Sequence, residues 1–88
     1  MKANELKSKI STIINLYNVR NFEGVVQESN RLVKKNPHND ILWNILGLAY
    51  QKLKKYQQAE ISFLRGLQEN SKNISGINNI GNNYKYLN

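Results

Sequence analysis

The 88-residue chain contains no cysteine, which excludes a disulfide framework, an iron–sulfur cluster and a thiol nucleophile. Its single histidine, His38, excludes a metal site built from several histidines. No apolar run approaches the roughly 20 residues that span a bilayer. The first residues also lack the uninterrupted apolar segment of a secretory signal. These absences favour one small domain that we expect in the cytoplasm, with no metal and no cofactor.

Acidic residues are also few, with six against 13 basic ones, and the formal net charge is +7. A balance of this kind favours an acidic protein, a nucleic acid or an acidic lipid as partner. The six carboxylates are scattered, and no two have the local spacing of a general acid and base. Glycine-rich phosphate loops are absent too. We therefore expect a protein that is not an enzyme.

Apolar residues recur at three- and four-residue steps in five segments, and no stretch alternates as a strand would. This periodicity predicts an all-α fold of antiparallel helical hairpins, with helices over residues 6–17, 22–36, 41–53, 56–69 and 74–88. Asn21, and either Asn39 or Asp40, are suited to cap the second and third helices. Pro37 ends the second helix at or before Asn36.

The most informative stretch runs from Trp43 to Phe63. Its spacing W-x2-L-G-x2-Y…A-x3-F resembles the tetratricopeptide repeat (TPR), a helix–turn–helix unit of about 34 residues. The segment L-G-x2-Y at residues 46–50 returns as I-G-x2-Y at residues 80–84. The resemblance implies a single TPR domain over residues 1–88, stacked as a short right-handed superhelix. Its repeats would span about residues 6–39 and 40–73, followed by a half repeat or capping helix over 74–88.

The first unit departs from the family pattern. Ile13-Ile14 replaces the Leu-Gly pair, and Ser29 stands where an aromatic residue is expected, which predicts looser packing there. Tyr17 and Phe22 are closer together in the sequence than the tyrosines that flank the second turn. This spacing predicts that the first turn is one residue shorter.

In TPR proteins the first helix of each hairpin lines a concave groove that holds an extended peptide. The resemblance therefore implies a groove lined by Asn15, Asn18, Asn44, Ile45, Leu48, Gln51, Lys52, Asn78, Asn79 and Asn82. Amides suit this role because one side chain both donates and accepts hydrogen bonds. Ile41, Ile45 and Leu48 either form an apolar pocket in this groove or pack against the first helix.

Two finer features of the TPR family concern these positions. The carboxylate clamp of some TPR domains is absent, because Ile45 and Ser75 stand at two of its places. Asn79 resembles the asparagine ladder of some TPR superhelices, although a match by chance is an equal alternative in a chain so rich in asparagine.

The last helix offers Asn78, Asn79, Asn82, Asn83 and Lys85 as a polar outer face. Gly81 and Tyr84, by contrast, sit where a following helix would pack. The segment is therefore either the first half of a third repeat or a face that a second copy covers. The candidate self-association residues are Ile80, Tyr84 and Leu87.

The main functional prediction is a non-catalytic module that binds a protein or peptide, an acidic one being an option. The alternatives are a self-associating scaffold and the N-terminal TPR adaptor of a larger enzyme such as a transferase. Nucleic acid is disfavoured, because most rings occupy packing positions. The helix directions also predict two basic edges, composed of Arg20, Lys52, Lys54, Lys55 and Lys85, and of Lys7, Lys9, Lys34, Lys35 and Lys72. These cations either complement helix dipoles or attract an acidic partner.

Overall fold

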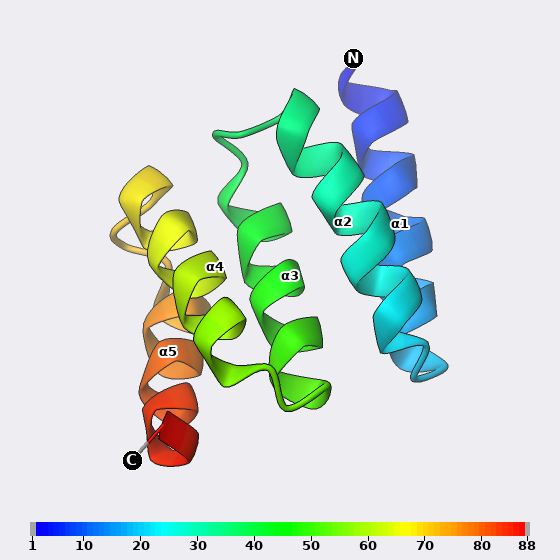
Figure 1. Cartoon of the computed structure of the whole chain (residues 1–88). Helices are drawn as coiled ribbons and strands as arrows, with labels where there is room; N and C mark the ends of the chain where they lie inside the picture. Colours follow the sequence, from blue (N-terminus) through cyan, green and yellow to red (C-terminus); the bar gives the residue numbers. More distant parts are fainter. Residues whose placement is uncertain (1, 88) are drawn as a thin grey trace.

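Five α-helices make up most of residues 2–87, the part of the chain that the computed structural model describes. They are α1 (Ala3–Asn18), α2 (Phe22–Lys35), α3 (Asp40–Lys52), α4 (Tyr56–Glu69) and α5 (Ile74–Leu87) (Figure 1). Residues 2–87 contain no strand. The predicted all-α class is therefore confirmed.

Asparagine side chains begin three of the helices. The Oδ1 atoms of Asn21, Asn39 and Asn73 each accept a hydrogen bond at 3.0 Å from the backbone amide three residues later. Each bond satisfies one of the free N–H groups of a first helical turn. The cap predicted at Asn21 is confirmed, and of the two candidates for the start of α3, Asn39 rather than Asp40 is the cap.

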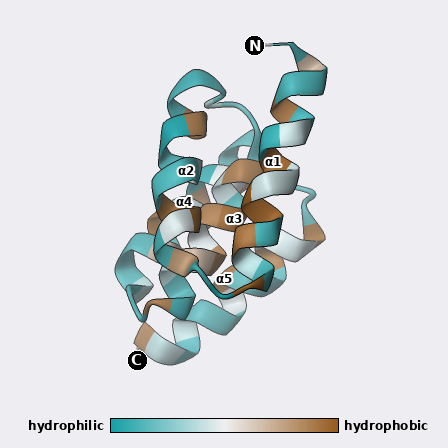
Figure 2. Cartoon of the chain, turned by 90° about the vertical axis from the view of Figure 1, so that its right-hand side faces the viewer, coloured by the Kyte–Doolittle hydropathy of each residue, from teal (hydrophilic) through white to brown (hydrophobic). Residues whose placement is uncertain are grey.

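Helix α3 lies at the centre of the molecule, because it packs against α2 and α4 and also contacts α1 and α5. The helices form two layers, with α1, α3 and α5 in one and α2 and α4 in the other (Figure 1). Apolar segments of α1 and α3 lie side by side in the middle of the molecule (Figure 2). We call the exposed surface of the first layer the odd-helix face.

Phe63 of α4 is fully buried against α3, at the position of Gly47. A Cβ atom at Gly47 would lie 2.5 Å from the Phe63 ring, so any larger residue would push the ring aside. The apolar core continues through Ala59 and Ile80 toward α5, and through Leu42 toward α2. Glycine at position 47 is thus what lets the two helices approach.

The backbone geometry of the first hairpin turn returns in the second. The turn after α1 and the turn after α3 both contain a residue with positive φ, Arg20 at 65° and Lys54 at 62°. In both turns the next amide donates to the carbonyl five residues before it, at 2.9 and 2.8 Å. The two hairpins therefore turn through the same number of residues, and Arg20 and Lys54 are equivalent positions.

This repeat corrects the sequence prediction of a shorter first turn, which is wrong. The carbonyl that closes the first turn belongs to Leu16, and the one that closes the second belongs to Tyr50. Leu16 is thus the residue equivalent to Tyr50, and Tyr17 is a neighbour at a different position. The sequence prediction aligned Tyr17 with Tyr50, and this alignment of the two hairpins is wrong by one residue.

At two equivalent positions, the large and the small side chain are on opposite helices in the two hairpins. When Arg20 is aligned with Lys54, Ile13 takes the place of Gly47, and Ser29 takes the place of Phe63. Ile13 is 1% exposed and Ser29 is fully buried. A cavity of about 140 Å³ between α1 and α2 is lined in part by Ile13 and Leu32 and does not include Ser29, so looser packing at Ser29 stays a prediction.

Candidate functional site

A small apolar cavity of about 150 Å³ lies between α1 and α3 on the odd-helix face. Ile14 and Tyr17 line it from α1, and Ile45 and Leu48 line it from α3. Because Ile14 is 43% exposed, the cavity is open to solvent. Its shape and lining suit one apolar side chain of a ligand.

The sequence identified half of this lining. Ile45 and Leu48 were predicted, whereas Ile14 and Tyr17 were not. A signal for Ile14 was present, because it precedes the first turn by the same interval as Leu48 precedes the second. Ile41, which was also considered for an apolar pocket, is 52% exposed and does not line the cavity.

Two predicted groove asparagines bond to each other. The Nδ2 atom of Asn79 in α5 donates to Oδ1 of Asn44 in α3 at 3.0 Å. The amide nitrogen of Asn44 and the amide oxygen of Asn79 keep their capacity to donate and to accept. Asn44 precedes Leu48 by four residues, so the two side chains are neighbours on the surface of α3 and the amide pair lies beside the cavity lining.

Gln51 bonds within the chain, to an asparagine that the sequence misplaced. Its Nε2 atom lies 3.3 Å from Oδ1 of Asn83, whose Nδ2 donates to the Tyr56 carbonyl at 2.8 Å. Asn83 is fully buried, so its assignment to a polar outer face is wrong. It joins α5 to α3 and α4, and both ends of its amide are satisfied inside the protein.

The remaining predicted groove residues carry exposed side chains on the three helices of the odd-helix face. They are Asn15, Asn18, Lys52, Asn78 and Asn82.

The candidate self-association residues differ in exposure. Ile80 is only 8% exposed and packs with Ala59 and Phe63, so it does not present its side chain to a second copy. Tyr84 is 42% exposed, and Leu87 is partly buried. Of this predicted face, Tyr84 is the residue with a broadly accessible side chain.

A positive charge lies close to the cavity. The Arg20 guanidinium is 5.4 Å from the centre of the Phe22 ring, which meets the Tyr17 ring edge-on at 5.2 Å. Burial raises the pKa of Tyr17, and the nearby Arg20 charge partly offsets this rise. The Tyr17 phenol is therefore neutral near pH 7, and the net charge at this end of the cavity is positive.

Neither a protein-family model nor a curated protein matches the chain.

A second polar cluster joins the turn after α2 to the end of α4. Glu69 bonds to Arg65 and lies 2.9 Å from Nδ1 of His38. These two bonds, the one from Arg65 above all, lower the pKa of the Glu69 carboxyl. Trp43 completes the cluster, since its Nε1 donates to the Pro37 carbonyl and its ring faces Arg65 at 5.3 Å. All four side chains are engaged in structural contacts.

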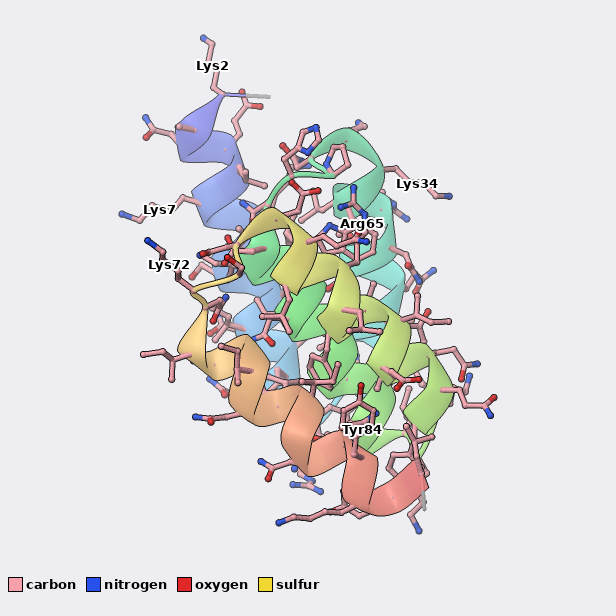
Figure 3. All side chains as sticks on the ribbon, turned by 90° about the vertical axis from the view of Figure 1, so that its left-hand side faces the viewer. Lys2, Lys7, Lys34, Arg65, Lys72 and Tyr84 are labelled. Atoms are coloured by element: carbon pink, nitrogen blue, oxygen red, sulfur yellow. The ribbon has the colours of Figure 1, made fainter. Side chains whose placement is uncertain are left out.

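The basic residues gather near the ends of the helices. Figure 3 shows Lys7, Lys34 and Lys72 in one half of the molecule, away from Tyr84. Within residues 2–87, no group of three or more His, Cys, Asp and Glu could hold a metal ion. No helix of that part of the chain is long and apolar enough to cross a bilayer.

Proposed function

We propose that this protein is a non-catalytic, TPR-like binding module that holds an extended peptide segment on its odd-helix face. The observation that carries this proposal is the apolar cavity lined by Ile14, Tyr17, Ile45 and Leu48, which lies beside the Asn44–Asn79 pair. Apolar cavities of about 150 Å³ accept a group the size of benzene. An aliphatic side chain of a ligand fits this description. The recurrence of the same backbone turn in both hairpins supports the TPR-like assignment.

The Asn44–Asn79 pair offers a hydrogen-bond donor and an acceptor that match those of a peptide backbone. Each residue of an extended peptide offers one N–H donor and one carbonyl acceptor. Within residues 2–87, no further hydrogen bond engages the amide nitrogen of Asn44 or the amide oxygen of Asn79, so one can donate and the other accept beside the cavity. The ligand's side chain would enter the cavity while its backbone bonds to the two asparagines.

The test is a selection of peptides from a random displayed library on the immobilised protein, followed by affinity measurements with a labelled selected peptide. Replacing Ile14 by Ser should weaken binding about tenfold, because it removes apolar contact worth about 1.4 kcal/mol. Ile61→Ser is the matched control. Ile61 is a 66% exposed isoleucine on α4, in the other layer.

Two outcomes would contradict the proposal. One is a library that yields no specific peptide for the folded protein. The other is a selected peptide whose affinity falls equally in Ile14→Ser and Ile61→Ser, because binding would then not depend on the cavity.

A second candidate function, self-association through α5, is favoured by one observation. A Cβ atom at Gly81 would meet nothing within 4 Å in the described chain, whereas the equivalent Gly47 is covered by Phe63. Ile77 and Tyr84 beside Gly81 are 49% and 42% exposed. A helix of a second copy could cover this stripe as α4 covers α3.

Light scattering over a wide concentration range tests self-association. The mass should rise toward that of a dimer, and Ile77→Lys should return it to a monomer. A monomer mass at every concentration would exclude this candidate without affecting peptide binding.

A further inference from the structure

The middle and C-terminal parts of α1, α3 and α5, the helices of the odd-helix face, carry no carboxylate. Four of the six, Glu23, Glu28, Glu60 and Glu69, lie on α2 and α4. The other two, Glu5 and Asp40, lie in the first turns of α1 and α3. Residues 6–22, 41–59 and 70–88 contain no Asp or Glu at all.

Asp40 is the carboxylate nearest to the cavity in sequence, and it is already bonded. Its Oδ2 atom accepts from the amides of Asn70 and Asn73, at 3.1 and 2.7 Å. These bonds direct its carboxylate toward the turn between α4 and α5. Its negative charge is thus held away from Ile45 and Leu48.

Cations flank the cavity instead. Lys52 is exposed and follows Leu48 by four residues and Ile45 by seven, which places it on the same side of α3. Arg20 lies beyond Tyr17 at the same end. Lys7, also exposed, precedes Ile14 by seven residues and extends the positive charge along α1.

We propose that the ligand of the odd-helix face is an acidic peptide segment, with an aliphatic side chain in the cavity and Asp or Glu residues directed toward Arg20 and Lys52. This inference rests on the proposed function and specifies its ligand. A nucleic acid is a poorer fit, because the only ring in the cavity lining is the partly buried Tyr17, which leaves no platform for stacked bases.

Two labelled peptides test the proposal. One has a central leucine flanked on both sides by aspartates, and the other has asparagines in place of the aspartates, so that shape is kept and charge removed. The acidic peptide should bind the wild-type protein about tenfold more tightly at about 0.05 M salt. This preference should shrink toward unity at about 0.5 M salt, where exposed charges are screened.

Reversing the charge of Lys52 tests whether the preference for the acidic peptide arises beside the cavity. Lys52→Glu should weaken the acidic peptide about tenfold and leave the asparagine peptide within about twofold. Lys35→Glu is the matched control, because Lys35 is likewise the exposed last residue of its helix and the net charge changes equally. It should change neither affinity by more than about twofold.

The outcomes separate this inference from the proposed function. Equal binding of both peptides, together with a loss in Ile14→Ser, would overturn the acidic preference and leave peptide binding intact. Binding of neither peptide, or binding insensitive to Ile14→Ser, would overturn both. A labelled single-stranded oligonucleotide that binds more tightly than the acidic peptide and loses affinity in Lys52→Glu would also overturn the inference.

Discussion

Two glycines at equivalent positions of the repeat have opposite surroundings. At Gly47 an added methyl group would clash with the buried ring of Phe63, 2.5 Å away. At Gly81 the same group would meet nothing within 4 Å among residues 2–87. Packing inside the chain therefore requires glycine at the first position and leaves the second free to change.

We predict that alanine at these two positions shifts stability in opposite directions. Gly47→Ala should destabilise the protein by about 1–3 kcal/mol, because the core around Phe63 becomes overpacked. Gly81→Ala should stabilise it by about 0.8–1 kcal/mol, through higher helix propensity. Urea denaturation of both variants measures the change, and each serves as the control for the other. A destabilised Gly81→Ala variant would show that α5 packs against something that the single chain does not contain.

At this scale the sequence identified apolar core positions better than polar ones. The residues Ala59 and Phe63 were placed correctly because their spacing matches a helix face. Asn83 was placed wrongly, because an asparagine is expected at the surface unless its hydrogen-bond partners are known. Its partners are separated from it by 27 and 32 residues, and no local pattern indicates them.

Among the elements, the end of α4 carries the interaction with the clearest pH dependence. The pKa of Glu69 lies below its ordinary value of 4.5, because Arg65 and His38 bond its charged form. A carboxyl group whose pKa falls on folding contributes stability above its unfolded pKa. That contribution is lost as the pH falls through the folded value.

We therefore expect Glu69→Gln to flatten the acid side of the stability curve. Between about pH 5 and pH 3 the variant should lose less stability than the wild type, as measured by urea midpoints at each pH. Arg65→Gln should have a similar effect, because the Arg65 bond is the main cause of the shift. The double variant should match Glu69→Gln alone, and additive effects would rule out this pairing.

The bounds of α2 and α3 were predicted to within one residue, because Asn21, Asn39 and Pro37 mark them in the sequence, whereas α1 begins three residues before its predicted start. The predicted bounds of α4 coincide with the observed ones, and α3 begins and ends one residue earlier than predicted. The length of the first turn was predicted wrongly. Side-chain identity suggested one alignment, whereas the positive φ of Arg20 and Lys54 sets another.

Within residues 2–87, α3 contacts all four other helices and so connects both ends of the stack. In a stack of this kind, the stability of each helix depends mainly on its contacts with the adjacent helices. Asn83 is the fully buried polar link from α5, through Gln51 of α3 and the Tyr56 carbonyl of α4, and the bond from Asn79 to Asn44 is a second link.

Asn83→Ala should therefore loosen the molecule locally. The substitution leaves buried polar groups unpaired and should cost about 1–3 kcal/mol. Hydrogen exchange should accelerate in α5 and in the first turn of α4, while α1 and α2 keep wild-type rates. Equal acceleration in all five helices would show instead that the chain opens as one cooperative unit.

The candidate site was predictable where it follows the repeat and unpredictable where it depends on pairing between helices. Asn44, Ile45 and Leu48 were identified from the family-like positions of α3. Ile14 was missed although it is the residue equivalent to Leu48, because the first unit departs from the motif. The bond between Asn44 and Asn79 depends on the distance between α3 and α5, which spacing within one helix does not define.

The exchange of sizes between the hairpins also specifies which helices pair as the chain folds. If α1 paired with α4, Ile13 and Phe63 would compete for one space, and the core would be overpacked. If α2 took the place of α4 on the Gly47 side of α3, Gly47 would face Ser29 and leave a void. Similar helices in one chain invite such mispairing, and here each wrong combination is penalised by volume alone. We therefore expect the complementary sizes to favour the native hairpins during folding, in addition to stabilising them afterwards.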